Sequence, residues 1–579
     1  MLENFFSSIF LLVIFYTFGK SFIQIIGLKT TANHFETIFL GIFSLSFFGL
    51  ITSFFYPINF IFSLTITFLS FFLCFYKFKF KDFTLDKKFL MIFVFVALII
   101  SLFMGYENYP YPSDSDYYHA NGVKWLTEMG TLTGLANLNI RIGFSTTWHI
   151  VAAFVDSLFF KDKAIWLMPI ISYLATFGYF SWEYLNSEKI WIKLYSAINI
   201  FWIFINVYTW GFPSLHYDFI SLVYHSILIF KILKIELKYK ECDYSDLYII
   251  FIFATASFLI KPMAAVSVLF SCCYITFKLL KTLKLKPHVL IKVYSLPAIA
   301  FIAWLSRNIV LSGWPLFPNP VLGLNVDWKT SYINTLTAYK EIKAWARMPI
   351  PELQKAMVAP FSVWFPFWVK NNFTSTRFIL LAIVPTLIAL NLLGMKFKIL
   401  FKNRSFIFLF VWHIAALLFW FVIAPDIRFG DGFFITISSL IICYSLKNYS
   451  LEFSKVKFDF LFFSYVFFLS FACIALLVVG KRGPVSFFTT GKHNSGPVIK
   501  KQNIINGNVV FEAWMPVSVE ECYKESISKI CPNETDAKLY TPLQFCSNSP
   551  LPCMPSYDEN LRFRNNKDYQ DGFKLFDSK

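Results

Sequence analysis

The chain has 579 residues, of which 57% are hydrophobic and 15% charged, with a formal net charge of +17 and a mean hydropathy of +0.57. A soluble domain carries about 25% charged residues, so this composition excludes an ordinary soluble protein. The basic excess does not indicate nucleic-acid binding, because the Lys residues are spread over short loops between apolar segments.

The apolar segments predict an all-α polytopic membrane protein. A helix needs about 20 mostly apolar residues to cross the hydrocarbon core, and such stretches recur from residue 4 to residue 479. The first is expected to stay in the membrane, because the N-terminus lacks a basic segment and a small-residue cleavage site. The close pair 245–260 and 262–279 is compatible with one bent element. About fourteen spans are expected, at 4–27, 36–55, 57–76, 89–105, 163–182, 189–208, 216–233, 245–260, 262–279, 289–310, 376–394, 405–424, 430–446 and 458–479.

The loops between these spans predict the orientation. Lys and Arg in short loops mark the cytoplasmic side, and the five richest loops all fall on one side of the predicted spans: 77–88, 231–240, 278–286, 396–404 and 447–457. We therefore expect a bacterial cytoplasmic membrane protein with a transmembrane domain at 1–479. Its outer side would hold the N-terminus, the loops 106–162, 209–215, 311–375 and 425–429, and an exoplasmic domain at 480–579.

The outer loop 106–162 carries Asp114, Asp116 and His119 within six residues. One interpretation is a solvated turn in which Asp116 caps a helix. The other is a carboxylate pair that binds a divalent cation such as Mg²⁺ or Mn²⁺, or that acts as a general base. The apolar spacing in 118–126 and 145–160 predicts two amphipathic helices lying at the membrane interface.

Charged and histidine side chains recur in the other outer loops and at the outer ends of spans. Several such clusters on one face indicate a shared cavity, and cations there suit a phosphate. A single Lys at a helix end, such as Lys261, is also compatible with snorkelling. Residues 335–357 predict a basic helix that either contacts lipid headgroups or is merely solvated. The candidate substrate-binding residues are His119, Arg141, His216, Asp218, Lys261, Arg307, Asp426 and Arg428.

The tail is expected to form a small β or α+β domain. Residues 504–514 contain an Asn-Gly step between β-type residues, which predicts a hairpin. Four exoplasmic cysteines predict two disulfides with three possible pairings, while zinc binding is the alternative that their spacing fits poorly. These are Cys522, Cys531, Cys546 and Cys553.

The segment SDSDYYHANGVKW, with Asp114 and Asp116, resembles the acidic outer loop of the GT-C superfamily of polytopic glycosyltransferases. The tail CSNSPLPCMPSYDENLRFRNNKDYQDGF is similar to the end of a group of uncharacterised bacterial membrane proteins with GT-C-like architecture. In typical members the acidic loop follows the first span, whereas here it follows the fourth. No phosphate-binding loop, dinucleotide fingerprint, nucleophile elbow or H-E-x-x-H motif is present in the sequence.

The resemblance implies transfer of a sugar from a polyprenyl-phosphate donor to a glycan, lipid or protein acceptor on the outer face of the membrane. Asp114 or Asp116 would deprotonate the acceptor, and Arg307, Lys261 or Arg428 would neutralise the lipid phosphate, with or without a metal. Two rivals are a flippase or transporter for lipid-linked sugar, and a polymerase or ligase of surface polysaccharide. The second depends more on Arg and His, and His149, His216 and His493 keep it open. A structural membrane component without activity is a third.

Overall fold

The computed structural model describes most of the chain. The four tail cysteines and His493 lie outside the described residues, as does the side chain of Asp116. The described ranges are 2–28, 33–77, 86–104, 114–210, 214–282, 287–350, 352–447, 461–472, 499–506, 509–516, 551, 561–565 and 569–575.

The first four long helices are α1 (Leu2–Ile25), α2 (His34–Thr52), α3 (Phe60–Lys77) and α4 (Lys87–Phe103). Helix α2 begins where the Asn33 side chain accepts a hydrogen bond from the Glu36 amide at 2.7 Å. Helices α1 and α2 approach each other closely at Gly19 and Gly41. A Cβ at either glycine would collide with the backbone of the other helix. Such close approach is typical of helix pairs in membranes.

The central helices are α8 (Ala164–Leu185), α9 (Ile190–Trp210), α10 (Asp218–Glu236), α11 (Tyr244–Ile260), α12 (Ala265–Phe277) and α13 (Pro287–Ser312). Helix α11 ends at Lys261, which is extended with φ −148°. Pro262 follows and opens the short helix η4 (Pro262–Ala264). The close pair of predicted spans is therefore two helices, since Pro cannot continue α11.

The C-terminal helices are α14 (Tyr332–Arg347), α15 (Leu353–Val358), α16 (Phe361–Phe373), α17 (Thr376–Phe378), α18 (Val384–Leu400), α19 (Arg404–Ile423) and α20 (Asp431–Leu446). The segment η6 (Ile379–Ile383) joins α17 to α18, and η7 (Ile427–Phe429) precedes α20. A further helix covers Leu461–Ala472.

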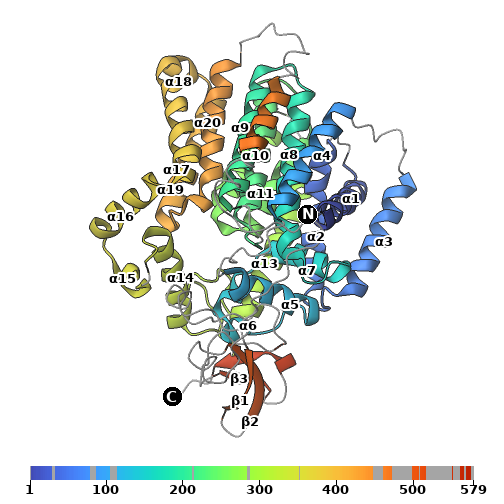
Figure 1. Cartoon of the computed structure of the whole chain (residues 1–579), viewed down its shortest axis with the longest axis vertical. Helices are drawn as coiled ribbons and strands as arrows, with labels where there is room; N and C mark the ends of the chain where they lie inside the picture. The colour runs from blue at the N-terminus through green and yellow to red at the C-terminus, as the bar shows by residue number, and fades with distance from the viewer. Residues whose placement is uncertain are drawn as a thin grey trace.

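The loop 106–162 folds into η2 (Ser115–His119), α5 (Ala120–Glu128), α6 (Leu135–Leu138), η3 (Ile140–Gly143) and α7 (Thr147–Leu158). Figure 1 shows α5, α6 and α14 gathered with the strands at one end of the long helices. The two predicted interfacial helices exist as α5 and α7, and their location at the interface stays a prediction. Nearly all residues of α7 are buried, because α2, α3, α5 and α8 pack around it.

Eight of the described helices are long and apolar enough to cross a membrane. A described helix lies at each predicted span, so the predicted helix positions are confirmed. Several of them, such as Tyr244–Ile260, are shorter apolar helices. The structure thus supports an all-α membrane protein, and the count of fourteen spans stays a prediction.

Two lysines of the predicted cytoplasmic loops 231–240 and 278–286 form ion pairs with acidic residues of other helices. Lys231 lies buried between Glu36 at 2.8 Å and Asp246 at 3.6 Å. Lys278 pairs with Glu236 at 2.7 Å. A buried charge needs such a partner, so these lysines tie helices together in addition to marking topology.

Two antiparallel strand pairs belong to the tail. Strands β1 (Ile499–Asn506) and β2 (Val509–Pro516) pair with Asn506 opposite Val509, which confirms the predicted hairpin. Strands β3 (Leu561–Phe563) and β4 (Phe573–Leu575) form the second pair. The Phe573 amide donates to the Thr133 carbonyl at 3.0 Å. The end of the tail therefore packs on the loop between α5 and α6.

Candidate functional site

Three histidines from distant parts of the chain meet at the folded loop 106–162. His119 ends η2, His149 lies in α7 and His216 precedes α10. His119 Nδ1 lies 2.7 Å from His149 Nε2, which is a hydrogen bond whose donor depends on the tautomers. The ring centroids of His119 and His216 are 5.3 Å apart. We call these residues the histidine cluster.

Short polar contacts explain why these segments come together. The Ser115 hydroxyl donates to the Ser214 hydroxyl at 3.3 Å, which ties η2 to the segment before α10. The Ser214 amide in turn donates to the Ile165 carbonyl at the start of α8. The Ser214 hydroxyl also accepts from the His216 amide at 3.0 Å. These bonds fix the backbone around the histidine cluster.

Burial keeps the cluster neutral at pH 7. Burial lowers the pKa of His149 to about 3, and the charge of Arg307 lowers it further. Burial, reinforced by its two histidine neighbours, holds the pKa of His119 well below its ordinary value. Burial also lowers the pKa of His216, although Asp114 opposes that shift. Neutral imidazoles can accept a proton or a hydrogen bond.

Tyr118 and Tyr217 lie against the imidazole rings of the histidine cluster. The Tyr217 ring centroid lies 5.5 Å from that of His119 and 5.8 Å from that of His149. Tyr118 lies 4.0 Å from His119 by the same measure. Burial raises the pKa of both phenols, and nearby carboxylates add to that shift. The hydroxyls therefore stay protonated and can donate hydrogen bonds.

Asp114 stands at the entry to η2 and makes no side-chain capping bond to that helix. Its negative charge acts on His216, Tyr118 and Arg428, so its carboxylate faces the same cluster. The helix-capping interpretation concerned Asp116, whose side chain lies outside the described part of the chain, so that interpretation stays a prediction.

Two ion pairs flank the cluster. Lys261 pairs with Asp218, and its Nζ lies over the Phe429 ring. Arg428 holds Asp426 through Nε at 3.0 Å and Nη2 at 2.8 Å. Burial works to raise the pKa of Asp426, but the charge and hydrogen bonds of Arg428 outweigh it, and the pKa is lowered. Both cations are thus largely neutralised by the protein itself.

Arg307 differs from the other cations of the site. It lies near the C-terminal end of α13 and is only 4% exposed. It donates to the Ser145 hydroxyl at 2.8 Å and to the Thr131 hydroxyl at 3.3 Å. Among the described residues it has no carboxylate partner within ion-pair distance. A buried charge paired only with hydroxyls is costly, so Arg307 is the cation best suited to an anionic ligand.

The structure places His119, His216, Asp218, Lys261, Arg307, Asp426 and Arg428 in the same part of the fold as Asp114. Their role in substrate binding stays a prediction. Arg141 instead pairs with Glu341 of α14 at 2.6 Å, although its charge still reaches Tyr118. Tyr118 and Tyr217 are site residues that the sequence pattern does not predict, and it indicates His149 only for the polymerase or ligase alternative. Adjacency was the only available signal for the tyrosines, since each precedes or follows a predicted histidine or aspartate.

A family model described as a domain of unknown function (DUF8201) matches residues 1–435. The chain belongs to this family. No curated protein and no solved structure matches the chain. The matched region contains every site residue from Asp114 to Arg428 and stops before the tail. The histidine cluster and its flanking ion pairs are therefore part of the family domain.

The predicted divalent cation was assigned to Asp114 and Asp116. Within the described part of the chain, no three His, Cys, Asp or Glu side chains are arranged to hold a metal ion. The histidine cluster does not form such a group either, because His119 Nδ1 and His149 Nε2 are hydrogen-bonded to each other. The side chain of Asp116 is not among those described, so the cation site stays a prediction.

Proposed function

We propose that this protein is a glycosyltransferase of the outer face of the bacterial cytoplasmic membrane, with fourteen spans, that takes its sugar from a polyprenyl-phosphate donor. One observation carries the proposal: carboxylate, imidazole and guanidinium groups from η2, α7, α10, α13 and η7 lie close enough together to act on one another. Polar groups gathered where a lipid-linked substrate would enter suit chemistry on its headgroup.

In this proposal Asp114 acts as the general base. Its carboxylate takes the proton of an acceptor hydroxyl, and the oxygen attacks the anomeric carbon of the donor. The bond from that carbon to the lipid phosphate breaks, and the phosphate leaves with the electron pair. A carboxylate that is not used to cap its own helix is available for such a step.

Arg307 binds the leaving phosphate in the same proposal. The guanidinium matches two phosphate oxygens, and its hydroxyl partners Ser145 and Thr131 fix its orientation without neutralising it. Lys261 and Arg428 shape the local field through their own ion pairs. A divalent cation at Asp114 and Asp116 would supply further charge for the phosphate.

The test is complementation of a gene deletion with Asp114→Asn, Arg307→Gln and the matched control Glu188→Gln. Glu188 is an exposed carboxylate between α8 and α9. The two site variants should lose about 100-fold or more of the transfer activity, so that lipid-linked sugar accumulates and the surface glycan is missing. The control should restore both. Unchanged glycan in Asp114→Asn at normal protein level would contradict the proposed base.

A polymerase or ligase of lipid-linked polysaccharide is the second candidate, because His149 and His216 now lie in one cluster beside Arg307. In that case a histidine would take the proton in place of Asp114. His216→Gln would then abolish activity while Asp114→Asn keeps it. The opposite result favours the first proposal, and the melting temperature of each variant shows that it is folded.

A further inference from the structure

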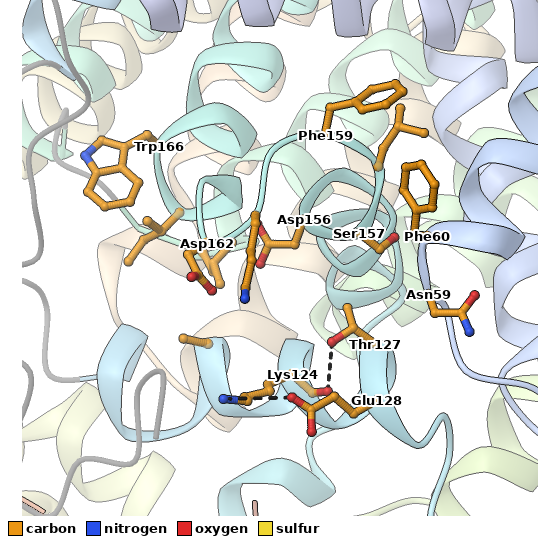
Figure 2. Close-up of a pocket in the computed structure, with 15 residues that line it drawn as sticks. Asn59, Phe60, Lys124, Thr127, Glu128, Asp156, Ser157, Phe159, Asp162 and Trp166 are labelled. Carbon is orange, nitrogen blue, oxygen red and sulfur yellow. Dashed lines mark hydrogen bonds and ion pairs between the residues drawn. The ribbon is translucent and has the colours of Figure 1, made fainter. Parts of the chain in front are cut away.

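A cavity of about 530 Å³ lies on the other side of α5 from the histidine cluster. Its volume is within the range of about 300–1,000 Å³ found for small-molecule sites. Figure 2 shows α5 on one side of it, with Lys124 and Glu128, and on the other the end of α7 with Asp156 and the following turn with Asp162. Ala120 and Leu215 line this cavity and directly follow or precede residues of the histidine cluster.

The lining combines both signs of charge. Asp162 and Glu128 are opposed by Lys124 and Lys161, so the walls come close to electrical balance. Asp156 adds little negative charge below about pH 7, because burial raises its pKa to about 7. Carboxylates disfavour a phosphate or another anion, and ammonium groups disfavour a cation. The remaining class is a neutral, strongly hydrogen-bonding ligand.

The charged groups that line the cavity form few close ion pairs within the described part of the chain. The Lys124–Glu128 pair is loose at 3.8 Å. Within the described residues, neither Lys161 nor Asp162 has an ion-pair partner. Asp162 is also held at φ 61°, in the left-handed region that non-glycine residues seldom adopt. Such local strain is common at binding sites.

Aromatic side chains form the rest of the wall. Phe60 and Phe159 lie edge to face with ring centroids 5.8 Å apart, and both line the cavity beside Trp166. Carboxylates that accept from hydroxyls, next to aromatic faces, suit a ligand with hydroxyl groups on one side and carbon-bound hydrogens on the other. A sugar ring has both.

We propose that this cavity binds a neutral saccharide, the acceptor of the transfer reaction, and that Asp162 and Glu128 accept hydrogen bonds from its hydroxyls. The role of this saccharide as the acceptor rests on the proposed function. The binding of a saccharide in the cavity does not depend on that function. A sugar held here would lie close to the histidine cluster, because Ala120 follows His119 and Leu215 precedes His216 in the chain.

The experiment measures binding to the full-length protein in lipid nanodiscs by saturation-transfer NMR. The probes are the methyl glycosides of glucose, galactose, mannose and N-acetylglucosamine, with inorganic phosphate as the anionic comparison. At least one glycoside should bind, and phosphate should not compete with it. Asp162→Asn and Glu128→Gln should each weaken that binding about tenfold. Asparagine also tolerates the positive φ of position 162.

Two controls separate this inference from the proposed function. Glu188→Gln should bind the glycoside as the wild type does. Asp114→Asn should also bind it normally even where transfer is lost. The inference is overturned if none of the glycosides binds, or if Asp162→Asn and Glu128→Gln bind like the wild type. An active Asp114→Asn variant that still binds sugar would instead count against the proposed base alone.

Discussion

Asp156 shows how a single carboxyl can make stability depend on pH. It is partly buried at the end of α7 and accepts a hydrogen bond from the Ala164 amide at 2.7 Å. Burial raises its pKa from 3.8 to about 7, and the nearby Asp162 adds to that rise. Lys124 and Glu128 face it from α5 across the cavity.

The folded pKa of Asp156 lies above its unfolded value, so folding favours the protonated form. Its contribution to stability is therefore fully present below about pH 4 and is lost as the pH rises through about 7. Asp156→Asn stays neutral and keeps an oxygen for the Ala164 amide. The melting temperature of the variant relative to wild type should rise between pH 4 and about 8. A constant difference over that interval would contradict the raised pKa, and Glu188→Gln is the matched control.

Among the elements, the contact between the tail and the outer loops depends on two glycines. Gly572 has φ 93° and a Cβ there would collide with the Thr133 carbonyl, while one at Gly134, with φ 69°, would collide with the Phe573 carbonyl. Gly572→Ala should therefore weaken the docking of β3 and β4 by about 1–3 kcal/mol. Limited proteolysis should then cut the tail faster than in wild type.

Gly394→Ala is the matched control for that experiment. A Cβ at Gly394 meets nothing within 4 Å, and the residue lies inside α18. Its proteolysis pattern should equal that of the wild type. Equal cleavage of Gly572→Ala and Gly394→Ala would show that the backbone contact between Gly572 and Thr133 does not hold the tail.

At the scale of the whole molecule, the sequence predicted helix positions well and side-chain partners poorly. Apolar length alone located the long helices of the predicted spans, which are α1 to α4, α8 to α13 and α18 to α20, because crossing a membrane sets a minimum length. It could not show that α7 is enclosed, since burial by neighbouring helices leaves the same apolar pattern as contact with lipid. Apolar length also could not predict the ion pair between Lys261 and Asp218, or that Arg307 bonds only to hydroxyls. Those contacts join residues far apart in the chain.

Orientation in the membrane is the property of the whole molecule that remains to be tested. Helices α5, α6 and α14 of the predicted outer loops lie together at one end of the bundle (Figure 1), and Lys in short loops predicts that the other end is cytoplasmic. An epitope inserted after Leu322, which is 71% exposed, should be reached by antibody in spheroplasts. One inserted after Lys240, in the turn before α11, should be reached only after permeabilisation. Labelling of both insertions, or the reverse pattern, would contradict the orientation and with it an outer-face reaction.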